Sequence, residues 1–109
     1  MTGELQGLVA SSSDAAQLHA PVPALLLELH TALGALCAAV TTATERGRRP
    51  FRPGPDWQSR LGELAYGVYL LADQTGVSLD DAVRATSGYV HQRAQQTRAS
   101  DANDWPIQQ

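Results

Sequence analysis

The chain has 109 residues, of which 43% are hydrophobic and 17% charged, and its formal net charge is −3. This length suits one modest core. The 11 acidic and 8 basic residues disfavour a general nucleic-acid binder, which gains much of its affinity from a basic surface. The single cysteine, Cys37, excludes an internal disulfide and a multi-thiolate zinc site. We find no apolar run near the roughly 18 residues that cross a bilayer and no secretory signal pattern. We therefore expect a cytoplasmic protein with no membrane partner.

The first half of the chain predicts two helices. Residues 1–10 place leucines and a valine at helical spacing, and we expect residues 11–14, three serines and an aspartate, to interrupt this helix, because their side chains compete for backbone hydrogen bonds. A longer helix is predicted over residues 23–46, where apolar residues recur on one stripe and a proline stands in the first turn. Gly47 suits the left-handed position after a helix. Residues 47–55, with three prolines and two glycines, predict a loop.

The second half predicts two more helices. Asp56 is expected to cap a helix over residues 57–74, which Gly76 ends. Ser78 and Asp81 resemble the start of a capping box for a helix over residues 79–98. Its inward-facing residues are expected to be Ala82, Val83, Thr86, Tyr89 and Val90. The predicted fold is therefore all-α, with three main helices and a short N-terminal helix in one domain over residues 1–98. Residues 99–109 are expected to form a polar tail.

The helix over residues 57–74 is apolar on two sides, which favours an oligomer. One stripe consists of Leu61, Leu64, Ala65, Val68, Leu71 and Ala72. Tyr66, Tyr69 and Leu70 project from the other side, and a helix that is apolar on both sides must be covered on both. We expect a homodimer or larger assembly with these three residues at its interface. The alternative is that the terminal helix covers them within one subunit.

Most catalytic motifs are absent, but one loop concentrates positive charge. The three histidines show no metal-ligand spacing, and Cys37 has no cationic neighbour in the sequence to activate it. Arg48, Arg49 and Arg52 are candidate phosphate contacts, because guanidinium groups bind phosphate oxygens in pairs. The alternative is a solvated loop whose charge balances an acidic chain.

Residues 60–83, with the sequence RLGELAYGVYLLADQTGVSLDDAV, carry a family resemblance. They resemble the second half of a MazG-like nucleotide pyrophosphohydrolase, and are similar to the phosphoribosyl-ATP pyrophosphohydrolases and dUTPases of the same all-α superfamily. Residues 33–40, LGALCAAV, resemble the first metal-binding helix of that family. The resemblance extends over about residues 23–95 and implies a MazG-like helical bundle.

The resemblance also implies a carboxylate cluster that holds Mg²⁺ against a nucleoside triphosphate. Three of its acidic positions fall on Thr31, Ala32 and Ala35, and a further pair falls on Arg60 and Glu63. Only Glu63 keeps a carboxylate, so the metal site is degenerate and no cofactor is expected. The resemblance therefore predicts a protein that has lost metal-dependent hydrolysis and serves as a nucleotide-binding or protein-interaction module.

Two alternatives stay open. Glu28 lies one turn before Ala32, so Glu28 and Glu63 could form a reduced Mg²⁺ site in a true pyrophosphohydrolase that releases pyrophosphate and a nucleoside monophosphate. The candidate pocket then consists of Glu28, Arg60, Glu63 and Arg93, the last being the match to the family's nucleotide-contacting residues. The other alternative is a helical adaptor unrelated in descent, which shares only amphipathic helices with the family.

Overall fold

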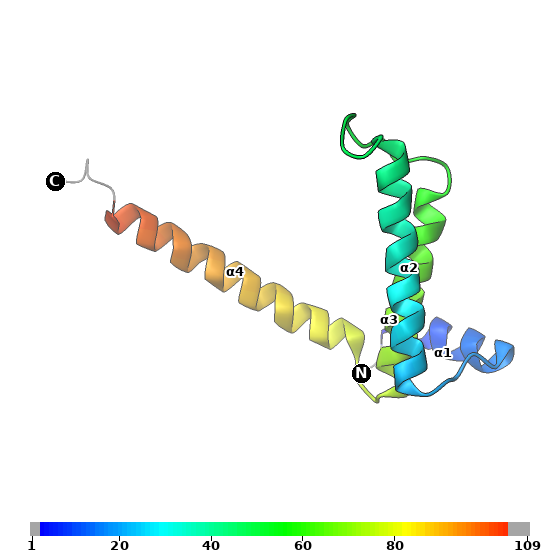
Figure 1. Ribbon diagram of the computed structural model, residues 1–109. Coiled ribbons are helices and arrows are strands. Elements are labelled where there is room, and N and C mark those ends of the chain that lie inside the picture. The colour runs from blue at the N-terminus through cyan, green and yellow to red at the C-terminus, as the bar shows by residue number, and fades with distance from the viewer. Residues whose placement is uncertain (1–2, 105–109) are drawn as a thin grey trace.

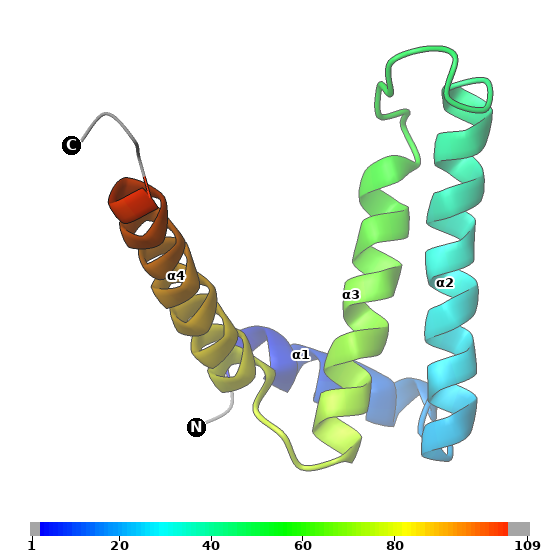
Figure 2. The same cartoon turned by 60° about the vertical axis from the view of Figure 1, so that its left-hand side comes forward.

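The computed structural model describes residues 3–104, and the side chains of residues 3–101. In this part of the chain four helices and no strand are present: α1 Glu4–Ala16, α2 Val22–Ala43, α3 Trp57–Gln74 and α4 Leu79–Asp104. Helices α2 and α3 lie side by side, α1 crosses beside the lower part of α3, and α4 leads away from this group (Figure 1; Figure 2). The all-α prediction is confirmed.

Helix α1 is longer than predicted, because its serines do not interrupt it. Ser12 Oγ donates to the Val9 carbonyl over 3.2 Å, and Ser13 Oγ donates to the Ala10 carbonyl over 3.1 Å. Both hydroxyls therefore bond to carbonyl groups of the preceding helical turn, and they do not disrupt the backbone hydrogen bonds of the helix. The helix ends at Gln17, whose φ of 56° is left-handed, and Leu18 N–H bonds back to the Ser13 carbonyl.

Helix α2 ends earlier than predicted, at Ala43 rather than residue 46. Glu45, Arg46 and Gly47 all have positive φ values, of 49°, 63° and 89°, which no α-helix accommodates. Thr44 holds this turn: its hydroxyl donates to the Val40 carbonyl and accepts from Gly47 N–H. The expected left-handed conformation of Gly47 is confirmed, while the two residues before it share that conformation.

Helix α3 has the predicted bounds and ends before Gly76, whose φ is 74°. The expected side-chain cap by Asp56 is wrong, since its carboxylate makes no hydrogen bond to the first turn. Ser78 does accept a bond from Asp81 N–H, at 3.4 Å, as the capping pattern predicted. Helix α4 continues past residue 98 to Asp104, so residues 99–104 are helical rather than a tail. The remaining tail residues lie outside the described part of the chain.

The core is small and lies where α1, α2 and α3 meet. Val9, Leu25 and Leu70 are its buried members, and they come from three different helices. The partly buried residues packed against them are Ala20, Tyr66, Tyr69 and Leu71. Ser12 and Tyr66 add a hydrogen bond of 2.6 Å between their hydroxyls, which joins α1 to α3. Helix α1 therefore covers the second apolar side of α3.

Gln6 joins α1 to the beginning of α4. Its side chain is 2% exposed, its amide nitrogen donates to the Val77 carbonyl over 2.7 Å, and its amide oxygen accepts from Leu79 N–H over 2.8 Å. The first bond is made to the segment between α3 and α4, and the second to the first residue of α4, whose N–H has no partner within the helix. A residue on the first helix thus fixes the place from which the last helix starts.

Helix α4 leaves the other helices after its first turn (Figure 1; Figure 2). Residues 81–101 are all exposed, and Val83, Tyr89 and Val90 have 57–59% of their surface accessible. The expectation that this helix buries an inward face, formed by the five residues listed above, is wrong for the single chain. The radius of gyration is 19.3 Å, against about 13 Å for a compact chain of 100 residues.

Helix α2 is long and apolar enough to cross a bilayer, judged by length and composition alone. The expectation that no apolar run approaches that length is therefore wrong, because the small residues between the leucines keep the whole segment apolar. A core helix of a soluble protein passes the same test, but it is then mostly buried. Only 11% of the most apolar stretch of α2 is buried.

Candidate functional site

Glu28 of α2 and Glu63 of α3 line one hollow of about 150 Å³ between their helices. The other walls are mostly apolar and consist of Leu18, Leu25, Leu29, Ala32, Tyr66, Gly67 and Leu70. Both glutamates are exposed, so water reaches their carboxylates. The structure therefore places this predicted pair in one surface hollow, which the core residues Leu25 and Leu70 also line.

In the described part of the chain, no further acidic side chain completes the carboxylate cluster that the resemblance implies. Among the described residues no three His, Cys, Asp or Glu side chains form a group that could hold a metal ion. Thr31 donates its hydroxyl to the Leu27 carbonyl of its own helix, and Ala32 contributes a methyl group to the hollow. Two carboxylates hold Mg²⁺ only weakly unless a substrate supplies further oxygens.

Arg60 and Arg93 lie apart from the two glutamates. Arg60 is half-buried and lines two other hollows, nearer the loop between α2 and α3. Arg93 lies on α4, where its guanidinium carbon is 5.8 Å from the centre of the Tyr89 ring. The predicted four-residue pocket is therefore divided among three places in this chain.

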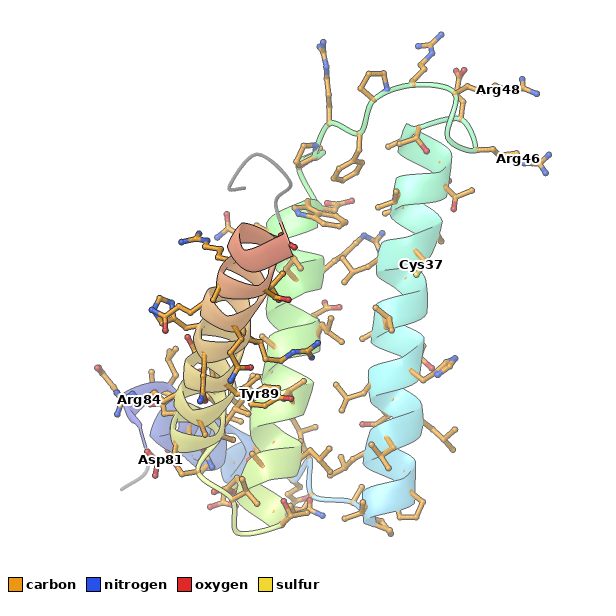
Figure 3. All side chains as sticks on the ribbon, turned by 90° about the vertical axis from the view of Figure 1, so that its left-hand side faces the viewer. Cys37, Arg46, Arg48, Asp81, Arg84 and Tyr89 are labelled. Carbon is orange, nitrogen blue, oxygen red and sulfur yellow. The ribbon has the colours of Figure 1, made fainter. Side chains whose placement is uncertain are left out.

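The loop over residues 46–52, which we call the arginine loop, has four arginines that fall into two groups. Arg46 and Arg48 point away from the helices into solvent (Figure 3). Arg49 and Arg52 instead line a hollow of about 310 Å³ with Ala43 and Pro50. Arg49 also forms an ion pair of 3.1 Å with Glu45. Of the three predicted phosphate contacts, Arg49 and Arg52 therefore line a hollow, and Arg48 lines none of the hollows described here.

Tyr66, Tyr69 and Leu70, the predicted interface, lie in or against the core. Leu70 is buried, and both tyrosines are half-buried against the Val9 cluster. Tyr66 and Tyr69 also line a hollow of about 210 Å³ beside Leu5 and Val9 of α1. Since α1 already covers much of this side of α3, it offers little surface to a second copy.

Comparisons with known proteins add no relative. No protein-family model, curated protein or solved structure matches this chain.

A polar cluster holds the segment between α1 and α2 against the end of α3. His19 Nε2 lies 2.5 Å from Asp14 Oδ1, and His19 Nδ1 lies 3.3 Å from Gln74 Oε1. The Gln74 amide also bonds to the backbone N–H and carbonyl of Ala20. The hydrogen bond to Asp14, and secondarily that to Gln74, raises the pKa of His19. Sequence reasoning missed this cluster, because Gln74 lies more than 50 residues from Asp14, His19 and Ala20 in the chain.

Two apolar helix faces lie exposed, which the sequence analysis did not predict. The α2 stripe consists of Val22, Leu26, Leu33 and Cys37, which fall on one side of the helix at spacings of four, seven and four residues and are all exposed. The α4 face consists of Val83, Thr86, Tyr89 and Val90, which share one side of that helix and were expected to face inward. Helical spacing predicts such faces, but not that they lie uncovered.

Proposed function

We propose that this protein is a non-catalytic interaction module whose first partner is a second copy of the same chain. The observation that supports it best is the exposure of α4 along residues 81–101. In the assembly, the α4 face of each copy packs on the α2 stripe of the other. Such a reciprocal contact has the two-fold form that most homodimers adopt.

Helix α4 needs to pack against another surface to be stable. Isolated helices draw little stability from their own hydrogen bonds in water, and helices in proteins are held mainly by packing of an apolar face. The middle of α4 contains Thr86, Ser87 and Gly88 in succession, none of which favours a helix. Without tertiary contacts, this helix would unfold for much of the time.

Two observations favour a second copy over other partners. The two surfaces belong to the same chain, so each copy supplies the cover that the other lacks. A bilayer suits α2 less well, because Glu28 lies within its apolar span and a charge there is costly.

Cys37 offers a test that needs no mutation. It is exposed in the single chain and belongs to the α2 stripe, and it is the only cysteine. We expect light scattering to report at least a dimer, and the thiol of the native protein to react with a disulfide reagent at least tenfold more slowly than in the unfolded protein. A monomer, or a thiol as reactive as that of the unfolded chain, would contradict the proposal.

The second candidate function is a pyrophosphohydrolase with a reduced site, and the shared hollow of Glu28 and Glu63 is the observation in its favour. This candidate rests on the sequence resemblance to MazG-like proteins, and the self-association proposal does not depend on it. We expect no release of pyrophosphate from any standard nucleoside triphosphate with Mg²⁺ or Mn²⁺, because too few carboxylates are present to anchor the ion. Turnover that Glu63→Gln abolishes would establish the enzyme instead.

A further inference from the structure

Arg60 belongs with the arginine loop rather than with the glutamates. Three hollows meet at Ala43, near the end of α2: one lies against the beginning of α3, one under the loop, and one along the alanines of α2. The first and third share Arg60, while the first and second share Arg52. Because they share these residues, the three hollows adjoin one another; we refer to them together as the Ala43 depression, which Arg49, Arg52 and Arg60 help to line.

The positive charge of this depression is largely uncompensated. In the described part of the chain, no carboxylate lies within ion-pair distance of Arg52 or Arg60. Arg49 is paired only with Glu45, at the solvent-exposed surface. One acid, Asp56, lines the part of the depression near α3 and opposes an anion there. Arg60 is half-buried, and desolvation strengthens the attraction between a guanidinium and a bound anion.

The beginning of α3 adds both positive potential and an apolar wall. The amino end of a helix carries a partial positive charge, and no side chain caps it here. Phe51 and Trp57 line the same hollow as Arg52 and Arg60, with their ring centres 4.9 Å apart and their planes at 62°. This edge-to-face pair fixes the loop that carries Arg52 against the helix that carries Arg60.

We propose that the Ala43 depression binds a ligand with two or three linked phosphoryl groups. Guanidinium groups donate paired hydrogen bonds to phosphoryl oxygens, and three of them around one depression match a chain of phosphoryl groups better than a single one. Free polyphosphate and the triphosphate of a nucleotide share this chemistry. The site is independent of the proposed self-association, since neither the α2 stripe nor the α4 face lines it.

Trp57 provides the measurement. In the full chain with Trp105→Phe, Trp57 is the only tryptophan, and its fluorescence is titrated with inorganic triphosphate and, separately, with ATP. We expect saturable changes at constant ionic strength. Equal dissociation constants would identify the phosphoryl chain as the whole ligand, and tighter binding of ATP would identify a nucleotide; both outcomes support the site.

Matched variants separate a site from general attraction to a basic loop. Arg52→Gln and Arg60→Gln are each expected to weaken triphosphate binding at least tenfold, while Arg48→Gln, which removes the same charge from the same loop, changes it less than threefold. Asp56→Asn is expected to strengthen binding. If Arg60→Gln does not fold, the exposed Arg52 carries the comparison. Absence of binding at millimolar triphosphate, or an equal loss in Arg48→Gln and Arg52→Gln, would overturn the proposal.

Discussion

Leu33→Glu is expected to separate the assembly into monomers, with a dissociation constant raised at least about 100-fold, or about 3 kcal/mol. Leu33 is 50% exposed in the single chain and lies in the middle of the α2 stripe. In the assembly its side chain would be buried against α4 of the partner. A carboxylate there would lose its hydration without gaining a partner, which opposes association strongly. Sedimentation velocity over a range of concentrations gives the dissociation constant.

Leu27→Glu is the matched control. Leu27 lies on the same helix and is 70% exposed, but six residues from Leu33 it points away from the stripe. The same substitution should therefore leave the assembly intact. On α4, Val90→Glu should dissociate the protein and Gln95→Glu should not, because Gln95 lies on the side of that helix opposite the α4 face. Equal behaviour within either pair would show that the copies meet through another surface.

Gln6→Leu is expected to lower the free energy of unfolding by about 2 kcal/mol. The substitution removes both bonds at the start of α4 and leaves the Val77 carbonyl and Leu79 N–H without their partner. Leucine fills most of the space, so the cost comes mainly from the two unpaired backbone groups. Chemical denaturation followed by circular dichroism measures the change, with the monomeric Leu33→Glu chain as background.

Gln92→Leu provides the comparison for this measurement. Gln92 is exposed on α4, so the same replacement there should change the unfolding free energy by less than about 0.5 kcal/mol. A loss below that value for Gln6→Leu would mean that water replaces the amide at no cost. The start of α4 would then be held by something other than α1.

Local signals in the sequence predicted the helices well, but not their surroundings. The bounds of α3 follow from a proline-rich loop on one side and Gly76 on the other, which are strictly local constraints. The serines of α1 misled the prediction, because the same hydroxyls that end helices can also bond to the preceding turn. The period of α4 predicted a helix with an apolar side correctly, but periodicity does not specify which surface covers that side.

The candidate site illustrates the same limit. Glu28 and Glu63 share a hollow because each lies on the side of its helix that faces the other. The sequence analysis assigned Arg60 to the same pocket as Glu63. Arg60 lies about one helical turn before Glu63, however, and lines a different hollow. The approach of Arg52 to Arg60 depends on the path of a loop with several prolines, and no periodic pattern predicts such a path.

The hydrogen bonds of Gln6 are among the contacts that hold the start of α4 beside the start of α1. Gly3, just before α1, lies so near Asp80 in the first turn of α4 that a side chain there would displace the Asp80 carboxylate. The direction in which the terminal helix projects is therefore set from the opposite end of the polypeptide.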